Sequence, residues 1–249
     1  MICPALTEIG ANAFYGCRAM KEFAISPAVI SVGKDAFVGV PAVTAVTSSA
    51  AVAEKIASSG AVAITLDLSW VEGDVAMALV TAETGCDSFA LNGGGKSFSN
   101  LTVESWAAAT DLNYIVFANS GAIPIKLHSE EVSLYRFDVE DCVPYALLLD
   151  ADSTNLHLSG TNSISTGNQM SVICRSVSVT YTNSGRLNVN HDILCCGTFT
   201  DSSNRVTILD GALRFITEEE YVAYKLGTVK LTFDACGGTL PANAERDTL

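Results

Sequence analysis

Short runs in which apolar and polar residues alternate recur along most of this chain. The clearest run spans residues 176–190, where Val177 and Val179 alternate with Ser and Thr. A turn at Asn183-Ser184-Gly185 interrupts the alternation, which then resumes. Alternation with a period of two is typical of strands that bury one face. The pattern therefore predicts a unit of strand, tight turn and strand.

This unit recurs at a spacing that indicates a solenoid. Residues 115–125 (IVFANSGAIPI) align with residues 179–189 (VTYTNSGRLNV), so that their Asn-Ser-Gly triplets coincide. The steps from Gly160 to Gly185 to Gly211 are 25 and 26 residues. One coil of a parallel β-helix takes about two dozen residues, and glycine adopts the positive φ of its tight bends. The alternative is a sandwich of hairpins, whose turns are more often two-residue Asn-Gly or Asp-Gly loops.

The chain after residue 60 contains further short strands separated by turn residues. They are expected at residues 61–68, 75–81, 98–103, 112–118 and 132–138. Residues 105–110 are interpreted as a helical turn.

Two segments predict short helices. Residues 47–60 contain a run of Ala, with Ser48 or Ser49 as the N-cap and a glycine at the end. We expect this helix to close the edge of the first repeats. Residues 217–226 begin with Thr217 as the N-cap and three Glu in the first turn. We expect this second helix to cover the open end of the solenoid.

Residues 1–46 contain a repeat of a different kind. Residues 9–17 (IGANAFYGC) match residues 32–40 (VGKDAFVGV) at a spacing of 23 residues. A fixed period in the twenties is typical of a solenoid in which each unit covers the apolar face of its neighbour. The pattern I-G-x-x-A-F-x-G-C-x-x-L resembles the BspA-like class of leucine-rich repeats, which is common on bacterial and some protist surfaces. The resemblance implies that the Ala-Phe pair and the Leu line the interior, and Val40 departs from the pattern at the Cys position.

Two further resemblances cover later parts of the chain. Residues 145–215 are similar to the β-helical domains of large secreted Gram-positive and Bacteroides-type surface proteins. Residues 229–240 (VKLTFDACGGTL) resemble the opening strand of the Listeria–Bacteroides repeat, a β-grasp-like module, with Cys236 where Asn is typical. Because that module continues for several tens of residues, we expect the last dozen residues to be poorly ordered.

Together these patterns predict a mainly β chain, with a short leucine-rich-repeat segment followed by a parallel β-helix (β-solenoid) and short capping helices. The expected domains are BspA-like repeats plus a closing helix at 1–60, the β-solenoid at 61–227 and a truncated Listeria–Bacteroides-type repeat at 228–249. Since Met1 falls inside a repeat, more repeats are expected upstream in a parent protein.

Composition and charge argue against several classes of function. The 249-residue chain has a formal net charge of −13 and only 14 basic residues. Nucleic acid is bound by clustered Lys and Arg, so a nucleic-acid partner is not expected. No apolar run approaches the ~18 residues of a membrane span, and no signal peptide is visible. None of the eight cysteines forms a C-x-x-C pair, so neither a metal site nor a disulfide framework is indicated.

Catalysis on a parallel β-helix needs carboxylates on one exposed face of neighbouring turns. The candidates are Asp150, Asp152, Asp192, Asp201 and Asp210. The period of two puts Asp150 and Asp152 on one side of a strand. At a turn the same pair is a solvated bend, which is the favoured interpretation. No Lys or Arg lies close to the pair in sequence.

Other candidate chemistry is weaker. His191-Asp192 with Cys195-Cys196 suggests a Cys-His nucleophile or a metal site, but the spacing of a metal site is missing and packing cysteines are favoured. The other two histidines, His128 and His157, are expected in unrelated strands. Residues 93–97 (GGGKS) lack P-loop spacing and are expected to form a bend. The aromatic residues suited to stacking on sugars are too scattered to make a platform: Trp70, Trp106, Tyr181 and Tyr224.

We therefore expect a non-catalytic adhesion or ligand-binding module of a bacterial cell-surface or secreted multidomain protein. No cofactor, metal or catalytic residue is assigned, and binding residues are left unassigned. The expected partner of this monomer is a host or bacterial surface protein or glycan. The alternatives are a carbohydrate-active β-helix enzyme (a polysaccharide lyase or glycoside hydrolase) and a structural stalk. Three carboxylates converging in a cleft favour the enzyme, and a polar face of Ser, Thr and Asn favours binding or scaffolding.

Overall fold

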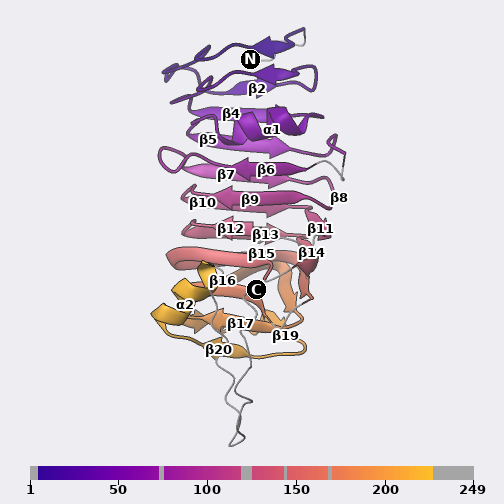
Figure 1. Ribbon diagram of the computed structural model, residues 1–249, viewed down its shortest axis with the longest axis vertical. Helices are drawn as coiled ribbons and strands as arrows, with labels where there is room; N and C mark the ends of the chain where they lie inside the picture. The colour runs from indigo at the N-terminus through magenta and orange to yellow at the C-terminus, as the bar shows by residue number, and fades with distance from the viewer. Residues whose placement is uncertain (1–4, 73–75, 119–124, 143–144, 168–169, 227–249) are drawn as a thin grey trace, which may run out of the picture.

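A computed structural model describes residues 5–72, 76–118, 125–142, 145–167 and 170–226. These residues form a parallel β-solenoid of about nine turns, stacked along one long axis (Figure 1). Two short helices accompany the strands. Every strand pair among the described residues is parallel. The expected mainly β solenoid is therefore confirmed, and the hairpin sandwich is wrong.

The strands fall into three faces. The first face stacks β2 (Phe23–Ile25), β4 (Ala42–Val46), β5 (Ala63–Asp67), β7 (Ser88–Asn92), β10 (Ala109–Asn113), β13 (Glu131–Tyr135) and β18 (Phe199–Thr200). The second stacks β8 (Ser97–Phe98), β11 (Val116–Ala118), β14 (Asp138–Cys142) and β19 (Val206–Ile208). The third stacks β6 (Met77–Val80), β9 (Leu101–Ser105), β12 (Ile125–Leu127), β17 (Asp192–Cys195) and β20 (Leu213–Phe215). The long strands β15 (Leu147–Thr166) and β16 (Met170–Val189) bend through all three faces.

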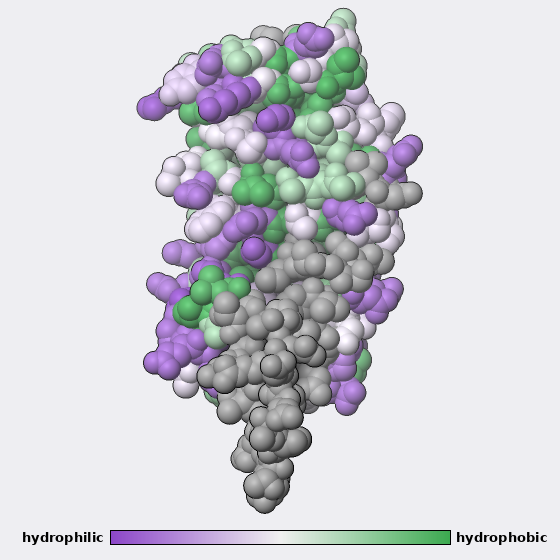
Figure 2. Space-filling view, in the orientation of Figure 1, coloured by the Kyte–Doolittle hydropathy of each residue, from purple (hydrophilic) through white to green (hydrophobic). Residues whose placement is uncertain are grey.

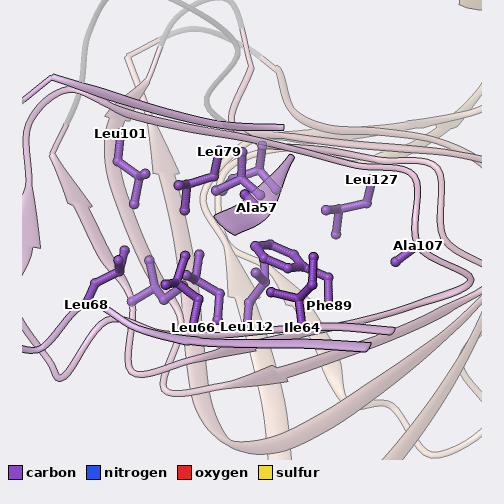
Figure 3. Packing of buried hydrophobic residues seen from close by; sticks show 14 of the residues in the cluster. Ala57, Ile64, Leu66, Leu68, Leu79, Phe89, Leu101, Ala107, Leu112 and Leu127 are labelled. Atoms are coloured by element: carbon purple, nitrogen blue, oxygen red, sulfur yellow. The ribbon is translucent and has the colours of Figure 1, made fainter. Parts of the chain in front are cut away.

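Residues at equivalent positions of successive turns form columns, and the inward columns make the core. One column of the first face is wholly aliphatic and buried: Ile25, Ala45, Leu66, Leu91, Leu112, Leu134 and Leu158. Figure 3 shows Leu66 and Leu112 on the opposite side of the interior from Leu79 and Leu101 of the third face. Each turn thus covers the apolar side of the turn before it, which is how a solenoid buries its core.

The N-terminal turns have the predicted 23-residue repeat. β1 (Glu8–Ile9) pairs with β3 (Ser31–Val32) so that Ile9 lies opposite Val32. The rings of Phe14 and Phe37 are stacked, with centroids 5.6 Å apart and planes 2° from parallel. The repeat is therefore a true structural period, in which equivalent residues pack on each other.

The helix expected within residues 47–60 is confirmed as α1 (Ala50–Ala57). Ser49 is its N-cap and accepts a hydrogen bond from the backbone N–H of Val52. The helix contacts both β3 and β6, and Glu54 Oε1 accepts a 2.8 Å hydrogen bond from the backbone N–H of Ala78. It lies inside the stack, so the expectation that it closes an edge is wrong.

The prediction that Gly160, Gly185 and Gly211 occupy equivalent bends is only partly correct. Thr161 pairs with Arg186, so Gly160 and Gly185 are equivalent, as expected from their 25-residue step. Leu187 pairs with Val206, which makes the next turn only 19 residues long, and Gly211 falls at a different corner, between β19 and β20. The triplet at 119–121 lies outside the described residues, and the strands flanking it, β11 and β12, belong to different faces from those flanking Asn183.

The expected helical turn at residues 105–110 is wrong. The segment is a sharp bend between β9 and β10, held by buried hydroxyl groups. Ser105 Oγ and Ser129 Oγ each lie 2.7 Å from Thr110 Oγ1, and Thr154 Oγ1 donates a 3.4 Å hydrogen bond to the carbonyl of Ser129. Equivalent corners of successive turns thus satisfy each other's polar groups inside the core.

The second expected helix is present as α2 (Glu218–Lys225), with a capping box between Thr217 and Glu220. It packs on the side of the stack, and the expectation that it covers the open end is wrong. Its buried Tyr221 lies in a second apolar cluster formed with Tyr145, Leu148, Ile173 and Leu194. Three of these residues occupy one outward column of the third face, and α2 shields that column from water.

Several predictions lie outside the described residues. They include the Listeria–Bacteroides-like strand at 229–240, the disorder expected for the last dozen residues, and Cys3 and Cys236. The proposed domain boundary at residue 60 stays a prediction; β4 and β5, on either side of it, pair through five residues.

Gly185→Ala is expected to destabilise the solenoid strongly. A Cβ atom at this position would lie 2.0 Å from the carbonyl oxygen of Leu158 in the previous turn, so the backbone of a whole turn must shift. Chemical unfolding followed by circular dichroism should show a loss of about 3 kcal/mol. The matched control is Gly10→Ala, where a Cβ meets nothing within 4 Å. Equal stability of the two variants would contradict the close stacking described here.

Candidate functional site

The structure brings Asp150 together with side chains that lie far from it in sequence. Asp150 belongs to β15, and its side chain is only 4% exposed. His128 Nδ1 lies 2.9 Å and Lys225 Nζ 2.5 Å from Asp150 Oδ2. The hydroxyl of Tyr221 donates a hydrogen bond to Oδ1. Both oxygens of this carboxylate are therefore engaged.

Strand register and the docking of α2 explain this meeting. β12 pairs with β15 so that Leu127 lies opposite Leu149. The residues that follow in the two strands, His128 and Asp150, are therefore neighbours on the outward side. Lys225 and Tyr221 both come from α2, at positions i+4 and i on one side of the helix.

The cluster extends along the stack in both directions. The ring of His128 stacks on Trp106, with centroids 3.5 Å apart, and His128 Nε2 lies 3.3 Å from Glu104 Oε1. On the other side, Arg175 donates hydrogen bonds of 3.0 and 2.7 Å to the two carboxylate oxygens of Glu218 in α2. Two separate ion pairs, from Lys225 and from Glu218, therefore hold the helix on the third face.

Electrostatics decide the chemical role of Asp150. Burial alone raises its pKa, but the hydrogen bonds from His128, Lys225 and Tyr221 outweigh burial and hold the pKa well below its usual value. Burial and then the hydrogen bond to Asp150 raise the pKa of Tyr221. A carboxylate that stays ionised and has both oxygens engaged cannot act as a general acid. The arrangement anchors α2 on the solenoid.

The neighbouring candidate, Asp152, lies in the irregular part of β15 between Leu149 and Ser153, so the period of two does not place it as the sequence predicted. Its side chain is fully exposed, and Oδ1 lies 3.8 Å from Arg175 NH1. The same guanidinium lies 3.9 Å from Asp150 Oδ1 through its Nε. The sequence showed no basic residue near this pair, because Arg175 reaches it only through the register of β16 on β15.

The remaining carboxylate candidates lie at other corners than Asp150. Asp210 lies at the corner of Asp192, where its backbone N–H donates a 2.8 Å hydrogen bond to the carbonyl oxygen of Asn190. Asp192 pairs with Arg214 and accepts a 2.8 Å hydrogen bond from the backbone N–H of Ala212. Asp201 closes a turn by accepting hydrogen bonds of 2.9 and 2.8 Å from the backbone N–H groups of Arg205 and Val206. These two carboxylates therefore hold bends between strands.

The histidine and cysteine candidates are also dispersed. His191 Nδ1 lies 3.2 Å from the carbonyl oxygen of Asp210. Cys195 points into the core, whereas Cys196 lies on the outward side with Sγ 3.5 Å from Glu218 Oε2. In the part of the chain that the structure describes, no group of three or more His, Cys, Asp or Glu is placed to hold a metal ion.

The aromatic residues singled out in the sequence lie at separate places, as expected. Trp70 follows β5 and is 62% exposed, and the ring of Trp106 stacks on that of His128. Tyr181 lies under the guanidinium of Arg205, and Tyr224 packs against the cluster beneath α2. Residues 93–96 form the expected bend between β7 and β8, and Ser97 begins β8.

A polar surface covers the first face from β10 to β16. Its outward positions carry mostly short polar side chains: Asp111, Asn113, Ser133, Asn155, Ser159, Ser178, Thr180 and Thr182. Side chains of neighbouring turns are hydrogen bonded, since Asn155 Nδ2 donates to Glu131 Oε1 at 2.7 Å. His157 belongs to this surface, with its ring nitrogens 3.0 and 3.1 Å from the hydroxyl oxygens of Thr180 and Thr182.

An open groove lies where the first face bends into the second. Its volume is about 790 Å³, and it is lined by Tyr135, Arg136, Asp138, Ser159, Gly160, Thr161 and Asn183. Tyr114, one turn earlier, lies edge-on to Tyr135, with ring centroids 4.8 Å and hydroxyl oxygens 3.1 Å apart. The guanidinium carbon of Arg136 lies 5.5 and 5.8 Å from the two ring centroids. Arg136 forms no ion pair with any described residue.

Sequence reasoning missed this groove. Its corner is built by left-handed residues, with φ of 52° at Tyr114, 50° at Arg136 and 62° at Gly160. Glycine and asparagine mark such corners in a sequence, but tyrosine and arginine do not. The available signal was the 21-residue separation of Tyr114 and Tyr135, which is close to one turn.

Comparison of the chain with family models, with curated proteins and with solved structures finds no match. None of the helices within the described ranges is long and apolar enough to cross a membrane. On the side shown in Figure 2, hydrophilic and hydrophobic residues are interspersed along the stack. The groove and the anchor beneath α2 are therefore judged on their own geometry.

Asp150→Asn is expected to weaken the attachment of α2 by about 3 kcal/mol, because it leaves a buried ion pair without its acid. The pKa of Asp150 is lowered by folding, so its stabilising effect is present above about pH 4 and is lost as the pH falls through the folded-state value. Unfolding of both proteins between pH 3 and 8 should give a difference that is largest above pH 5 and shrinks below pH 4.

The control is Asp152→Asn, which alters an exposed carboxylate of the same strand and should leave stability unchanged. A constant difference between the wild type and Asp150→Asn across the pH range would show that the carboxylate is not held in its ionised form.

Proposed function

We propose that this chain is a non-catalytic glycan-binding module of a bacterial cell-surface or secreted protein. The observation that carries the proposal is the groove lined by Tyr135 and Arg136, with Tyr114 packed against both, beside a face of short polar side chains. Aromatic rings pack against the C–H faces of sugars, and Arg, Asn and Thr form hydrogen bonds with hydroxyl or carboxylate groups. Arg136 is suited to this role because its guanidinium has no ion-pair partner among the described residues.

The adjacent first face supports an extended ligand. A solenoid offers one long surface with equivalent positions in every turn, and here those positions carry Ser, Thr and Asn. Cross-turn hydrogen bonds, such as those of His157 with Thr180 and Thr182, hold the side chains in place before binding. Such preorganisation lowers the entropic cost of association.

The N-terminal repeat supports a more specific assignment. Its 23-residue period and its stacked Phe14 and Phe37 fit a BspA-like leucine-rich repeat. That resemblance, together with the similarity to β-helical surface proteins, is the basis for proposing a monomer located outside the cell or at its surface. The partner is then a glycan of a host or bacterial surface.

The enzyme alternative receives less support from the geometry. Asp150 is buried and fully hydrogen bonded, and Asp192 and Asp201 hold bends. These carboxylates belong to different places on the stack, whereas glycoside cleavage needs two of them facing one bond. The third alternative, a structural stalk, predicts no ligand at all.

Arg136→Gln and Tyr135→Ala are each expected to reduce binding on an array of neutral and acidic oligosaccharides. Loss of an arginine hydrogen bond or of an aromatic contact should weaken affinity about tenfold, or about 1.4 kcal/mol. The matched control is Tyr15→Ala, which removes an exposed aromatic side chain from a distant turn and should leave binding unchanged.

A parallel assay of reducing ends after incubation with the bound polysaccharides separates the alternatives. Release of product would contradict a non-catalytic role. Absence of binding to every glycan would favour the stalk, and equal loss in all three variants would show that the groove is not the site.

A further inference from the structure

Two cysteines face each other across adjacent turns inside the core. Cys174 lies in β16 and Cys195 in β17, and the two are register partners. Both side chains are completely buried, and both carry free thiols in the structure. The interaction between the two thiols raises the pKa of Cys174 and lowers that of Cys195. Cys174 Sγ also lies 3.5 Å from the carbonyl oxygen of Leu194, and Cys195 Sγ lies 2.8 Å from that of Arg175.

This arrangement suits a covalent bond between turns. Neighbouring strands are about 4.8 Å apart, and disulfides join residues whose Cα atoms are about 4.4–6.8 Å apart. Side chains at paired positions point to the same side, here into the core. We propose that Cys174 and Cys195 form a disulfide that cross-links β16 to β17 near the C-terminal end of the stack.

No other pair of described cysteines is placed in this way. Cys142 is the register partner of Thr166. Cys196 follows Cys195 directly, so it points to the opposite side of the strand, toward Glu218. Burial, together with its contact with Glu218, raises the pKa of Cys196 to about 11, which makes it a poor competitor for oxidation.

The reaction is a thiol–disulfide exchange with a small disulfide, such as oxidised glutathione, as the oxidant. The thiolate of Cys195 attacks one sulfur of the oxidant, forms a mixed disulfide and releases one small thiolate. Cys174, whose pKa is raised by its interaction with Cys195 and by burial, loses its proton as its sulfur attacks the Cys195 sulfur and releases the second small thiolate. The two cysteines lose two electrons and two protons, and the oxidant becomes two thiols. The interaction with Cys174 lowers the pKa of Cys195, which favours Cys195 as the first nucleophile.

The position of the pair near the end of the stack provides access for the oxidant. β17 is covered on its C-terminal side by β20, where Phe215, the register partner of Cys195, is 66% exposed. Among the described strands, β20 pairs only with β17, and a turn with one neighbour opens more easily than a turn with two. Opening of the final turn, or folding in an oxidising compartment, therefore brings Cys195 into contact with solvent.

The bond also bears on the attachment of α2. Arg175 follows Cys174 and Cys196 follows Cys195, and both of these neighbours contact Glu218 of the helix. A cross-link between the two turns therefore fixes the spacing of the two groups that hold Glu218. The oxidised protein should keep both the final turns and α2 in place to a higher temperature than the reduced protein.

The test compares the purified chain after incubation with millimolar oxidised glutathione and after treatment with dithiothreitol. Thiol titration of the denatured, oxidised protein should find two fewer thiols than the eight of the sequence. Tandem mass spectrometry should place the bond between Cys174 and Cys195. The oxidised form should unfold roughly 5–10 °C above the reduced form, because the bond closes a loop of about one turn.

Cys196→Ser is the matched control and should keep both the bond and the difference in unfolding temperature, whereas Cys195→Ala should lose both. If Cys195→Ala does not fold, the mapping of the wild-type bond still decides the question. A bond between any other cysteines in place of Cys174–Cys195, or eight free thiols after oxidation, would overturn the proposal.

Discussion

The parallel, in-register pairing of successive turns is the constraint on which the rest of this structure depends. Backbone hydrogen bonds between turns place each residue beside its equivalent one turn away. A side chain is therefore tolerated only if the side chains above and below it in the column can pack against it or form hydrogen bonds with it. Aliphatic residues such as Leu66 and Leu91 cover each other, and the hydroxyls of Thr110 and Ser129 satisfy each other where the chain bends inside the core. The same rule brings Cys174 to Cys195 and Arg136 to Tyr114.

This constraint explains how much of the fold could be read from the sequence. Where turns have nearly equal length, the residues of one column recur at a fixed spacing in the sequence. The period is then visible directly, as in the pairs Ile9 and Val32 or Gly160 and Gly185. Glycine marks a bend but does not say which bend, so Gly211 was assigned to the wrong corner when the turn length fell to 19 residues. The chemistry of Ser and Thr in residues 105–110 predicts a helical turn as readily as a bend, because both satisfy polar groups locally.

The outward surfaces were harder to predict, because outward positions need no apolar neighbour and so leave no periodic pattern in the sequence. Asp150 and Lys225 are 75 residues apart, and they meet only because α2 returns to the side of the stack. The helix itself was predictable from Thr217 and the glutamates of its first turn. The place where the helix docks could not be predicted, because the apolar outward column of Leu148, Ile173 and Leu194 is visible only after the strand register is known. The column of Tyr114 and Arg136 was hidden because neither residue signals a left-handed corner.

The two polar clusters differ in how completely their charges are matched. Beneath α2, Asp150 and Arg175 meet partners on several sides, and opposite charges lie within hydrogen-bond reach. A matched buried charge holds two elements in one arrangement and offers little to a ligand. In the groove, the guanidinium of Arg136 faces two aromatic rings and forms no ion pair with a described residue. Asp138 also lines the groove, and its Oδ1 accepts a 2.5 Å hydrogen bond from Ser163 Oγ. A solenoid stabilised by its apolar columns can keep such a residue without an ion pair, because the inward columns, and not the outward charges, supply most of the stability of the stack.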